Sequence, residues 1–173
     1  LQFHNGMLSV GPESASSDPG PSCYRKGGPL AITDANLVLG RLQPDYFPHI
    51  FGPNRDESLD AAAPLTLFQG MLGHVMESGT AGGISSVHEL ALGFIRVANE
   101  AMCRPIREMT SARGFDIRSH VLSVFGGAGG QHACAVARAL GISRVFVHKY
   151  ASVLSAYGLS GAELVEESQT PAA

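Results

Sequence analysis

The sequence predicts an α/β fold. Residues 120–148 contain a short apolar run, a glycine-rich loop, a small-residue helix pattern and a second apolar run, which is the order of a strand–helix–strand crossover. Residues 86–112 show the apolar spacing of a long amphipathic helix. Residues 11–29 are rich in proline and glycine, which predicts an irregular segment. These patterns place the predicted crossover in the C-terminal half of the chain.

The N-terminal ten residues, LQFHNGMLSV, predict a β-hairpin. The dipeptide Asn5-Gly6 at their centre favours the type I′ turn that joins two antiparallel strands. The proline- and glycine-rich segment from Gly11 to Pro29 follows this hairpin. Its composition prevents regular backbone hydrogen bonding and predicts either an ordered crossing segment or a linker.

Two helices are predicted in the middle of the chain. The stretch TDANLVLGRL predicts a helix capped by Thr33 or Asp34, because short polar side chains accept hydrogen bonds from the first helical amides. Residues 59–77 predict a second helix capped by Ser58, which serves either as packing or as a variable insertion. The sequence SGTAGG after it predicts a flexible break.

The longest helix is predicted to begin at Ser86. Glu89 stands three residues later, which matches the capping box, and apolar residues then recur at helical spacing. Pro105 is expected to kink or interrupt this helix, because proline lacks a backbone N–H.

The glycine loop from Gly126 to Gly130 joins the first strand of the crossover to a helix predicted over residues 131–140. Gly141 is expected to end that helix, and residues 142–148 predict the next strand, in a right-handed parallel crossover. Free amides and the positive end of the helix dipole would meet at the loop and could hold an anion. The alternative is an ordinary tight turn, because neither GxGxxG nor the lysine of a P-loop is present.

The composition excludes several function classes. A formal net charge of −3 offers no basic face, so nucleic acid is not an expected partner. The 3 cysteines and 7 histidines lack the spacing of a disulfide framework or of a metal site, so no metal is expected within this chain. No apolar run reaches membrane-spanning length, and no membrane partner is expected. Cysteine usage predicts a reducing, cytoplasmic compartment.

Four blocks of the sequence resemble consecutive blocks of the hydantoinase A/oxoprolinase family, in the family's order. They are GPESASSDPGPSCYRKGGPLAITDANLVLGRLQPDYFP (residues 11–48), GFIRVANEAMCRPIREMTSARGFD (93–116), FGGAGGQHACAVARALGI (125–142) and SVLSAYGLSGAEL (152–164). The wordings GGAGGQHAC and CYRKGGP, with the FGP at residues 51–53, are most similar to the oxoprolinase branch. The resemblance is weakest between Asn54 and Gly83.

The resemblance implies a fold and an activity. The fold is α/β, a partial actin-like (ribonuclease H-type) ATPase lobe that contains the strand–glycine loop–helix–strand crossover. The activity is hydrolysis of 5-oxo-L-proline to L-glutamate with cleavage of ATP, a step of the glutathione/gamma-glutamyl cycle. Two alternatives stay open, namely a hydantoinase-type ATP-dependent cyclic amidohydrolase subunit and a noncatalytic remnant of the family.

The resemblance also implies where the nucleotide binds. In the wider actin-like superfamily a strand, a GG turn and a helix meet the adenosine part of the nucleotide. The residues that match are Gly126, Gly127, Ala128, Gly129, Gly130 and His132. Asn99, Glu100 and Asp34 are possible secondary contacts, with a structural hydrogen bond or helix cap as the alternative for each. No catalytic residue is assigned.

The resemblance further implies that the chain is a fragment. The family's phosphate-contacting glycine run lies immediately before GPES, where this chain carries LQFHNGMLSV. The expected partners are therefore ATP, a small lactam and the remainder of the enzyme, with a homodimer possible for the full enzyme. Magnesium ligands are expected outside this chain, and the fragment alone is expected to be inactive.

The sequence divides into four expected parts. Residues 1–58 form an extended proline- and glycine-rich segment with one short helix, and residues 59–84 form the variable helical insertion and break. Residues 85–165 form the actin-like ATPase subdomain, and residues 166–173 form a disordered tail.

Overall fold

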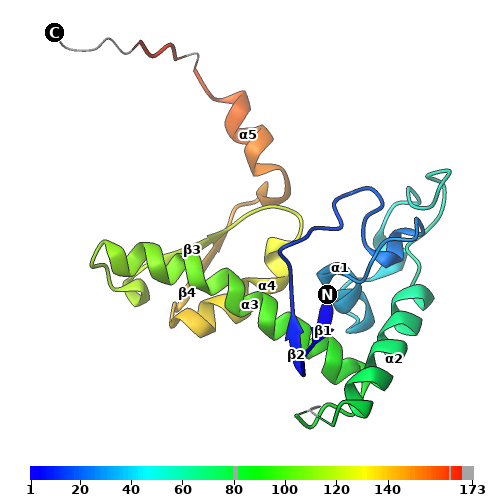
Figure 1. Cartoon of the computed structure of the whole chain (residues 1–173). Coiled ribbons are helices and arrows are strands. Elements are labelled where there is room, and N and C mark those ends of the chain that lie inside the picture. Colours follow the sequence, from blue (N-terminus) through cyan, green and yellow to red (C-terminus); the bar gives the residue numbers. More distant parts are fainter. Residues whose placement is uncertain (80–81, 164, 169–173) are drawn as a thin grey trace. The chain divides into compact units, whose positions relative to one another are not determined.

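The computed structural model describes residues 1–79, 82–163 and 165–168 and shows a mixed arrangement of helices and short strands (Figure 1). The chain divides into two compact units, Leu1–Ile106 and Arg107–Ala173. The domain limits expected from the sequence stay predictions, and residues 80–81 of the expected break, Leu164 at the end of the expected subdomain and residues 169–173 of the expected tail lie outside the described residues.

The first unit opens with the predicted β-hairpin. Strand β1 (Gln2–His4) pairs antiparallel with β2 (Met7–Ser9), with Phe3 opposite Leu8. Asn5 and Gly6 both have positive φ, at 49° and 77°, as a type I′ turn requires. This element is therefore confirmed.

The segment that follows the hairpin is an ordered crossing segment and not a linker. The Gly20 amide donates to the Ala15 carbonyl at 3.0 Å, and the Ser22 amide donates to the Pro29 carbonyl at 3.0 Å. A short 3-10 helix, η1 (Ser22–Tyr24), lies between these contacts. The segment thus satisfies its backbone groups by irregular, long-range pairing, which its proline content allows.

The first two α-helices begin at other residues than the sequence predicted. Helix α1 (Ile32–Val38) has Ala31 as its N-cap, so Thr33 and Asp34 lie inside the helix, and the 3-10 helix η2 (Pro44–Tyr46) follows it. Helix α2 (Ala62–Glu77) starts three residues later than expected. Asp60 Oδ1 accepts from the amides of Ala62 and Ala63. Asp60 therefore satisfies the first amides of α2, the role that the sequence predicted for Ser58.

Helix α3 (Val87–Ala112) is the longest helix. The Glu89 amide donates to Ser86 Oγ at 3.2 Å and Glu89 Oε2 accepts from the Ser85 amide at 2.8 Å, so the predicted capping interaction is confirmed. The helix is continuous through Pro105, so the expected interruption does not occur. The boundary between the two units nevertheless falls close to Pro105, between Ile106 and Arg107.

The main core of the first unit lies between α1, α2 and α3. The rings of Phe68 on α2 and Phe94 on α3 are fully buried, with centroids 6.2 Å apart. Leu30, Ala35, Val75, Leu90, Ala91 and Ile95 complete this cluster. The hairpin contributes Phe3 and Leu8 to its edge. A smaller cluster of Cys23, Leu37, Phe51 and Leu59 holds the irregular segment.

The second unit contains the predicted crossover. After the 3-10 helix η3 (Ile117–Ser119), strand β3 (Val121–Val124) leads through the glycine loop into α4 (Gly129–Leu140) and then β4 (Arg144–Val147). The two strands pair in parallel, with Val124 opposite Val147. The α/β crossover is therefore confirmed, with α4 starting two residues earlier than expected. The 3-10 helix η4 (Ala151–Val153) and α5 (Leu154–Ser160) follow.

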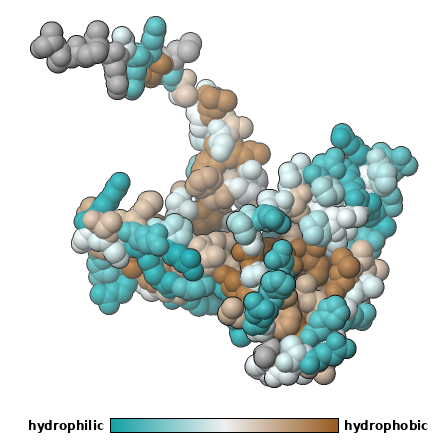
Figure 2. Space-filling model, viewed as in Figure 1, coloured by the Kyte–Doolittle hydropathy of each residue, from teal (hydrophilic) through white to brown (hydrophobic). Residues whose placement is uncertain are grey.

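The second unit buries one face of its helix but little of its sheet. Ala133, Val136, Ala137 and Leu140 on α4 are buried, whereas Phe146 and Val147 on β4 are 52% and 57% exposed. Exposed apolar side chains also lie along the segment that carries α5 (Figure 2). Parallel strands normally have both faces covered, whereas the described residues leave these two side chains of β4 half-exposed.

Candidate nucleotide site and cavity

The glycine loop is anchored by its first glycine. Gly126 has φ of 88°, a left-handed conformation that favours glycine. Its amide donates to the Ala151 carbonyl at 2.8 Å. This contact fixes the loop to the turn that follows β4, and it removes the Gly126 amide from the groups available to a ligand.

The next amides of the loop remain available. The N–H groups of Gly127, Ala128, Gly129 and Gly130 have no hydrogen-bond acceptor in the part of the chain that the structure describes, and Gly127 and Ala128 are exposed. They lie at the N-terminus of α4, where the helix dipole is positive. They also lie beyond the carboxyl ends of two parallel strands, where ligands bind in open α/β sheets. The loop can therefore bind an anion or a polar edge of a ligand.

The glycines of the loop differ in what surrounds them. A Cβ on Gly129 would lie 2.8 Å from Val124 Cγ1, so this glycine lets α4 approach β3 closely. A Cβ on Gly127 or Gly130 would meet no atom within 4 Å. Substitutions at Gly127 and Gly130 therefore probe a ligand without disturbing the packing of the unit.

His132 does not lie on the exposed surface of the loop. Its side chain is only 5% exposed, on a helix whose neighbouring Ala133 and Val136 are buried. Asn99 is half-buried and Glu100 is exposed, and both lie on α3 in the first unit, whereas the loop belongs to the second. Contact of these three side chains with a nucleotide stays a prediction.

Asp34 holds the irregular segment together. Its buried carboxylate accepts from the Ser22 amide at 3.1 Å, the Cys23 amide at 2.9 Å and the Ala31 amide at 2.7 Å. Ala31, and not Thr33 or Asp34, is the N-cap residue of α1. Asp34 is the third residue of the helix, and it contributes to the cap by accepting from the Ala31 amide. Two of its three partners lie more than ten residues away, and such contacts leave no local sequence signal.

The thiol of Cys23 is held in its protonated form. Burial raises its pKa, and the negative charge of Asp34 raises it further. We therefore expect Cys23 to resist iodoacetamide at pH 8.5 in the native protein and to react after denaturation, because the thiolate is the nucleophile. Peptide mass spectrometry of the alkylated protein checks this, and rapid native labelling of Cys23 would contradict it.

The hydroxyl of Ser22 is buried and has no hydrogen-bond partner among the residues that the structure describes. An unsatisfied buried hydroxyl destabilises the native state, so Ser22→Ala should raise the free energy of unfolding by about 1 kcal/mol. The shift of the urea midpoint measures this change. A loss of stability would show that Oγ has a partner in solution.

Arg25 and Lys26, the two basic residues that follow η1, contact neighbouring groups. Arg25 Nε donates to the Ser58 carbonyl at 2.7 Å, and its Nη1 lies 3.5 Å from Glu57 Oε2. Lys26 Nζ lies 3.8 Å from Asp18 Oδ2. These contacts give both cations a structural role in the irregular segment.

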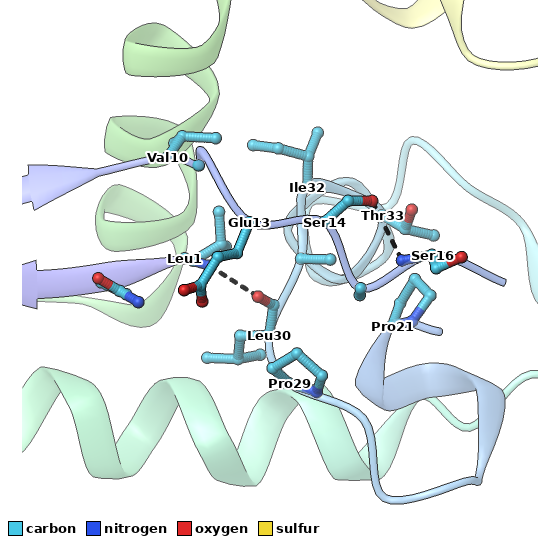
Figure 3. Close-up of a pocket in the computed structure, with 14 residues that line it drawn as sticks. Leu1, Val10, Glu13, Ser14, Ser16, Pro21, Pro29, Leu30, Ile32 and Thr33 are labelled. Atoms are coloured by element: carbon cyan, nitrogen blue, oxygen red, sulfur yellow. Dashed lines mark hydrogen bonds between the residues drawn. The ribbon is translucent and has the colours of Figure 1, made fainter. Parts of the chain in front are cut away.

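A cavity of about 430 Å³ lies between the hairpin, the irregular segment and the start of α1. Glu13 and Ser14 come from the segment after β2, and Ile32 and Thr33 come from α1 (Figure 3). The site residues expected from the sequence do not include any of these four. The GPES wording that carries the family resemblance contains Glu13 and Ser14, and it is the one signal that could have indicated them.

The described residues hold no group of three or more histidine, cysteine, aspartate or glutamate side chains that could bind a metal ion. Among the same residues, no helix is both long and apolar enough to cross a membrane.

Comparison with known proteins identifies the family. Residues 1–168 match the family described as Hydantoinase/oxoprolinase. The chain belongs to the hydantoinase/oxoprolinase family. It is 51% identical over 99% of its length to 5-oxoprolinase 1 of Arabidopsis thaliana, and 54% identical over 99% to 5-oxoprolinase of Saccharomyces cerevisiae. It spans 14% and 13% of the length of these two relatives.

Two solved structures of the family share the fold. The crystal structure of ATP-dependent caprolactamase from Pseudomonas jessenii aligns with 91% of this chain at a TM-score of 0.74 and 34% identity, and the chain covers 21% of it. The nucleotide-free structure of acetone carboxylase aligns with 90% at a TM-score of 0.72 and 27% identity, and the chain covers 20% of it. The fold class expected from the resemblance is thus confirmed.

Proposed function

We propose that this chain is the nucleotide-binding part of an ATP-dependent 5-oxoprolinase, which hydrolyses 5-oxo-L-proline to L-glutamate with ATP cleavage in the glutathione/gamma-glutamyl cycle. Identities of 51% and 54% to proteins named 5-oxoprolinase support this substrate. The proposed compartment is the cytosol, which the free state of all three cysteines supports.

The observation that carries the proposal is the row of available amides at the start of α4. The N–H groups of Gly127 to Gly130 have no acceptor among the residues that the structure describes, while Gly126 holds the loop in place through Ala151. We propose that these amides bind ATP, and that His132, Asn99 and Glu100 contact the nucleotide in the assembled protein. Amides that are already held in place can bind the polar atoms of the adenosine part without a cost of ordering the loop.

In this proposal the cyclic amide is opened at the expense of ATP. The chain positions the nucleotide and does not supply a nucleophile. The described residues hold no cluster that suits Mg²⁺, so its ligands are proposed to lie in the remainder of the enzyme. The other proposed partners are ATP, the lactam and a second copy in a homodimer of the full enzyme.

The test is Gly127→Val in the natural gene product that contains this chain. The added side chain enters open space, so the fold should persist while the affinity for ATP falls about tenfold or more. Isothermal titration with ATP measures the affinity, and Gly70→Val is the matched control, since Gly70 is equally open but lies on α2. Unchanged ATP affinity in Gly127→Val would overturn the proposed nucleotide site.

A second candidate keeps the fold and changes the substrate to a hydantoin or another cyclic amide. It is favoured by the likeness to ATP-dependent caprolactamase at 34% identity. Comparing glutamate release from 5-oxo-L-proline with hydantoin opening, each at saturating ATP, separates the two candidates.

A further inference from the structure

Aromatic side chains lie beside the glycine loop in the second unit. Phe125 directly follows β3, and His148 and Tyr150 follow β4. Because β3 and β4 pair in parallel, with Val124 opposite Val147, these residues come to the same edge of the sheet as the loop. Ligands of open α/β sheets bind at this edge. The rings and the available amides of the loop therefore face the same kind of ligand position.

His148, Tyr150 and Tyr157 form an aromatic cluster at this edge. The ring centroids of Tyr150 and Tyr157 lie 5.2 Å apart. The centroid of His148 lies 5.7 Å from that of Tyr150 and 5.4 Å from that of Tyr157. Tyr157 belongs to α5, so the cluster joins this helix to the end of β4.

Backbone hydrogen bonds fix the aromatic cluster relative to the loop. The Gly126 amide donates to the carbonyl of Ala151, the residue after Tyr150, at 2.8 Å. The Ala151 amide donates to the His148 carbonyl at 2.9 Å, and the Tyr150 amide donates to His148 Nδ1 at 3.1 Å. A ligand that contacts both the loop and the cluster would meet two surfaces that are already placed, which reduces the cost of ordering them.

Tyr157 offers the most open ring of the aromatic cluster. It is 51% exposed, whereas Tyr150 is 42% exposed and carries the ammonium of Lys149 at 4.8 Å from its ring centroid. The contacts of Tyr157 with His148 and Tyr150 restrict its ring without covering it. A planar ligand can therefore stack on this ring.

The charges around the loop favour an anionic ligand. The chain carries no aspartate or glutamate from Ile117 to Ala162, a range that includes both strands, the loop and the aromatic cluster. The whole chain has a formal net charge of −3, so this range differs in sign from the rest. A phosphate would meet no carboxylate of this range at the edge of the sheet. The basic residues of the range are Arg118, Arg138, Arg144 and Lys149.

A nucleotide matches all three of these features. Its base has a flat face for the ring of Tyr157, its sugar and base carry acceptors for the loop amides, and its phosphates suit a region without carboxylates. An apolar protein segment packed on the same surface would leave the amides of Gly127 to Gly130 without acceptors, which is unfavourable once water is excluded.

We propose that the ring of Tyr157 is the stacking surface for the base of the nucleotide that the glycine loop binds. This assignment rests on the proposed function and names the side chain that contacts the base. His148 and Tyr150 pack against the ring of Tyr157 from within the aromatic cluster. Stacking uses the face of the base, so it tolerates different bases but requires an aromatic side chain.

The experiment separates an aromatic ring from an apolar side chain at position 157. Isothermal titration with ATP is carried out on the natural gene product that contains this chain, as wild type, Tyr157→Phe and Tyr157→Leu. Tyr157→Leu should weaken ATP binding about fivefold or more, because the base loses its stacking partner. Tyr157→Phe keeps the ring and should stay within about twofold of the wild type. The control is Tyr46→Leu, at an 88% exposed tyrosine of the first unit, which should leave the affinity unchanged.

A second measurement needs no variant. Photolysis of 2-azido-ATP bound to the wild type, followed by peptide mass spectrometry, should place the label on the peptide that contains Tyr157. Wild-type ATP affinity in Tyr157→Leu, equal weakening in Tyr157→Phe and Tyr157→Leu, or a label confined to other peptides would each overturn the assignment. The proposed function would survive these results if Gly127→Val still weakens ATP binding, whereas a wild type that does not bind ATP would reject the proposed function itself.

Discussion

Asp34→Ala should lower the free energy of unfolding by about 3–4 kcal/mol, because it leaves buried amides without an acceptor. The Ser22 amide keeps a second acceptor in the Pro29 carbonyl, but no second acceptor for the amides of Cys23 and Ala31 lies among the described residues. Asp34→Asn should recover only part of the loss. The carboxamide offers one oxygen, whereas both oxygens of Asp34 accept in the native structure.

Native-state hydrogen exchange of peptides that contain Cys23 and Ala31 measures this effect locally, so other parts of a large protein do not obscure it. Asp56→Ala is the matched control, because Asp56 is exposed and should change stability by no more than about 0.5 kcal/mol. Protection of both amides at the wild-type level in Asp34→Ala would refute the structural role of this carboxylate.

Gly28→Ala is expected to destabilise the protein by about 2–3 kcal/mol through steric overlap. Gly28 is buried, and a Cβ at this position would overlap the carbonyl oxygen of Gly20, which belongs to the backbone and cannot rotate away. Gly20 is itself held by its hydrogen bond to Ala15. The stretches of backbone around Gly20 and Gly28 must therefore move apart to admit a methyl group.

The urea midpoint of the natural gene product measures this change. The same substitution at Gly70 is the control, since Gly70 lies on α2 with open space around it and Gly70→Ala should raise stability by about 0.5–1 kcal/mol. Equal midpoints for Gly28→Ala and wild type would mean that the close approach of Gly20 and Gly28 relaxes without cost.

The elements that sequence patterns predicted well are those with local signals. The Asn5-Gly6 turn and the contact of Ser86 with Glu89 depend on residues within a few positions of each other, and both are present in the structure. The crossover was also predictable, since its glycine loop separates two apolar runs and Gly141 ends α4 in a left-handed conformation.

The irregular segment was not predictable in this way. The sequence pattern indicates a helix cap at Asp34. Its bonds to the amides of Ser22 and Cys23 span 12 and 11 residues, and contacts of this range leave no periodic pattern in the sequence. Helix α2 begins at Ala62 because Asp60, and not Ser58, reaches its first amides, which is a choice between two equally suitable cap residues.

The candidate site was predicted in part. The glycine loop could be recognised because its residues are contiguous in the sequence, but the bond from Gly126 to Ala151 depends on the tertiary structure. The cavity was missed because its lining is drawn from several separate segments between Leu1 and Thr33. Which polar residues of a loop face a common space is decided by folding and cannot be inferred from spacing.

The bond between the Gly126 amide and the Ala151 carbonyl connects the glycine loop to a pair of tyrosine rings, whose NMR signals can report on the loop. Ala151 directly follows Tyr150, whose ring centroid lies 5.2 Å from that of Tyr157. A displacement of the loop by a bound molecule would move Ala151 and so change the surroundings of the neighbouring Tyr150 ring. Fluorine-labelled tyrosine at position 150 would therefore register occupancy of the loop as a change in chemical shift, without any turnover.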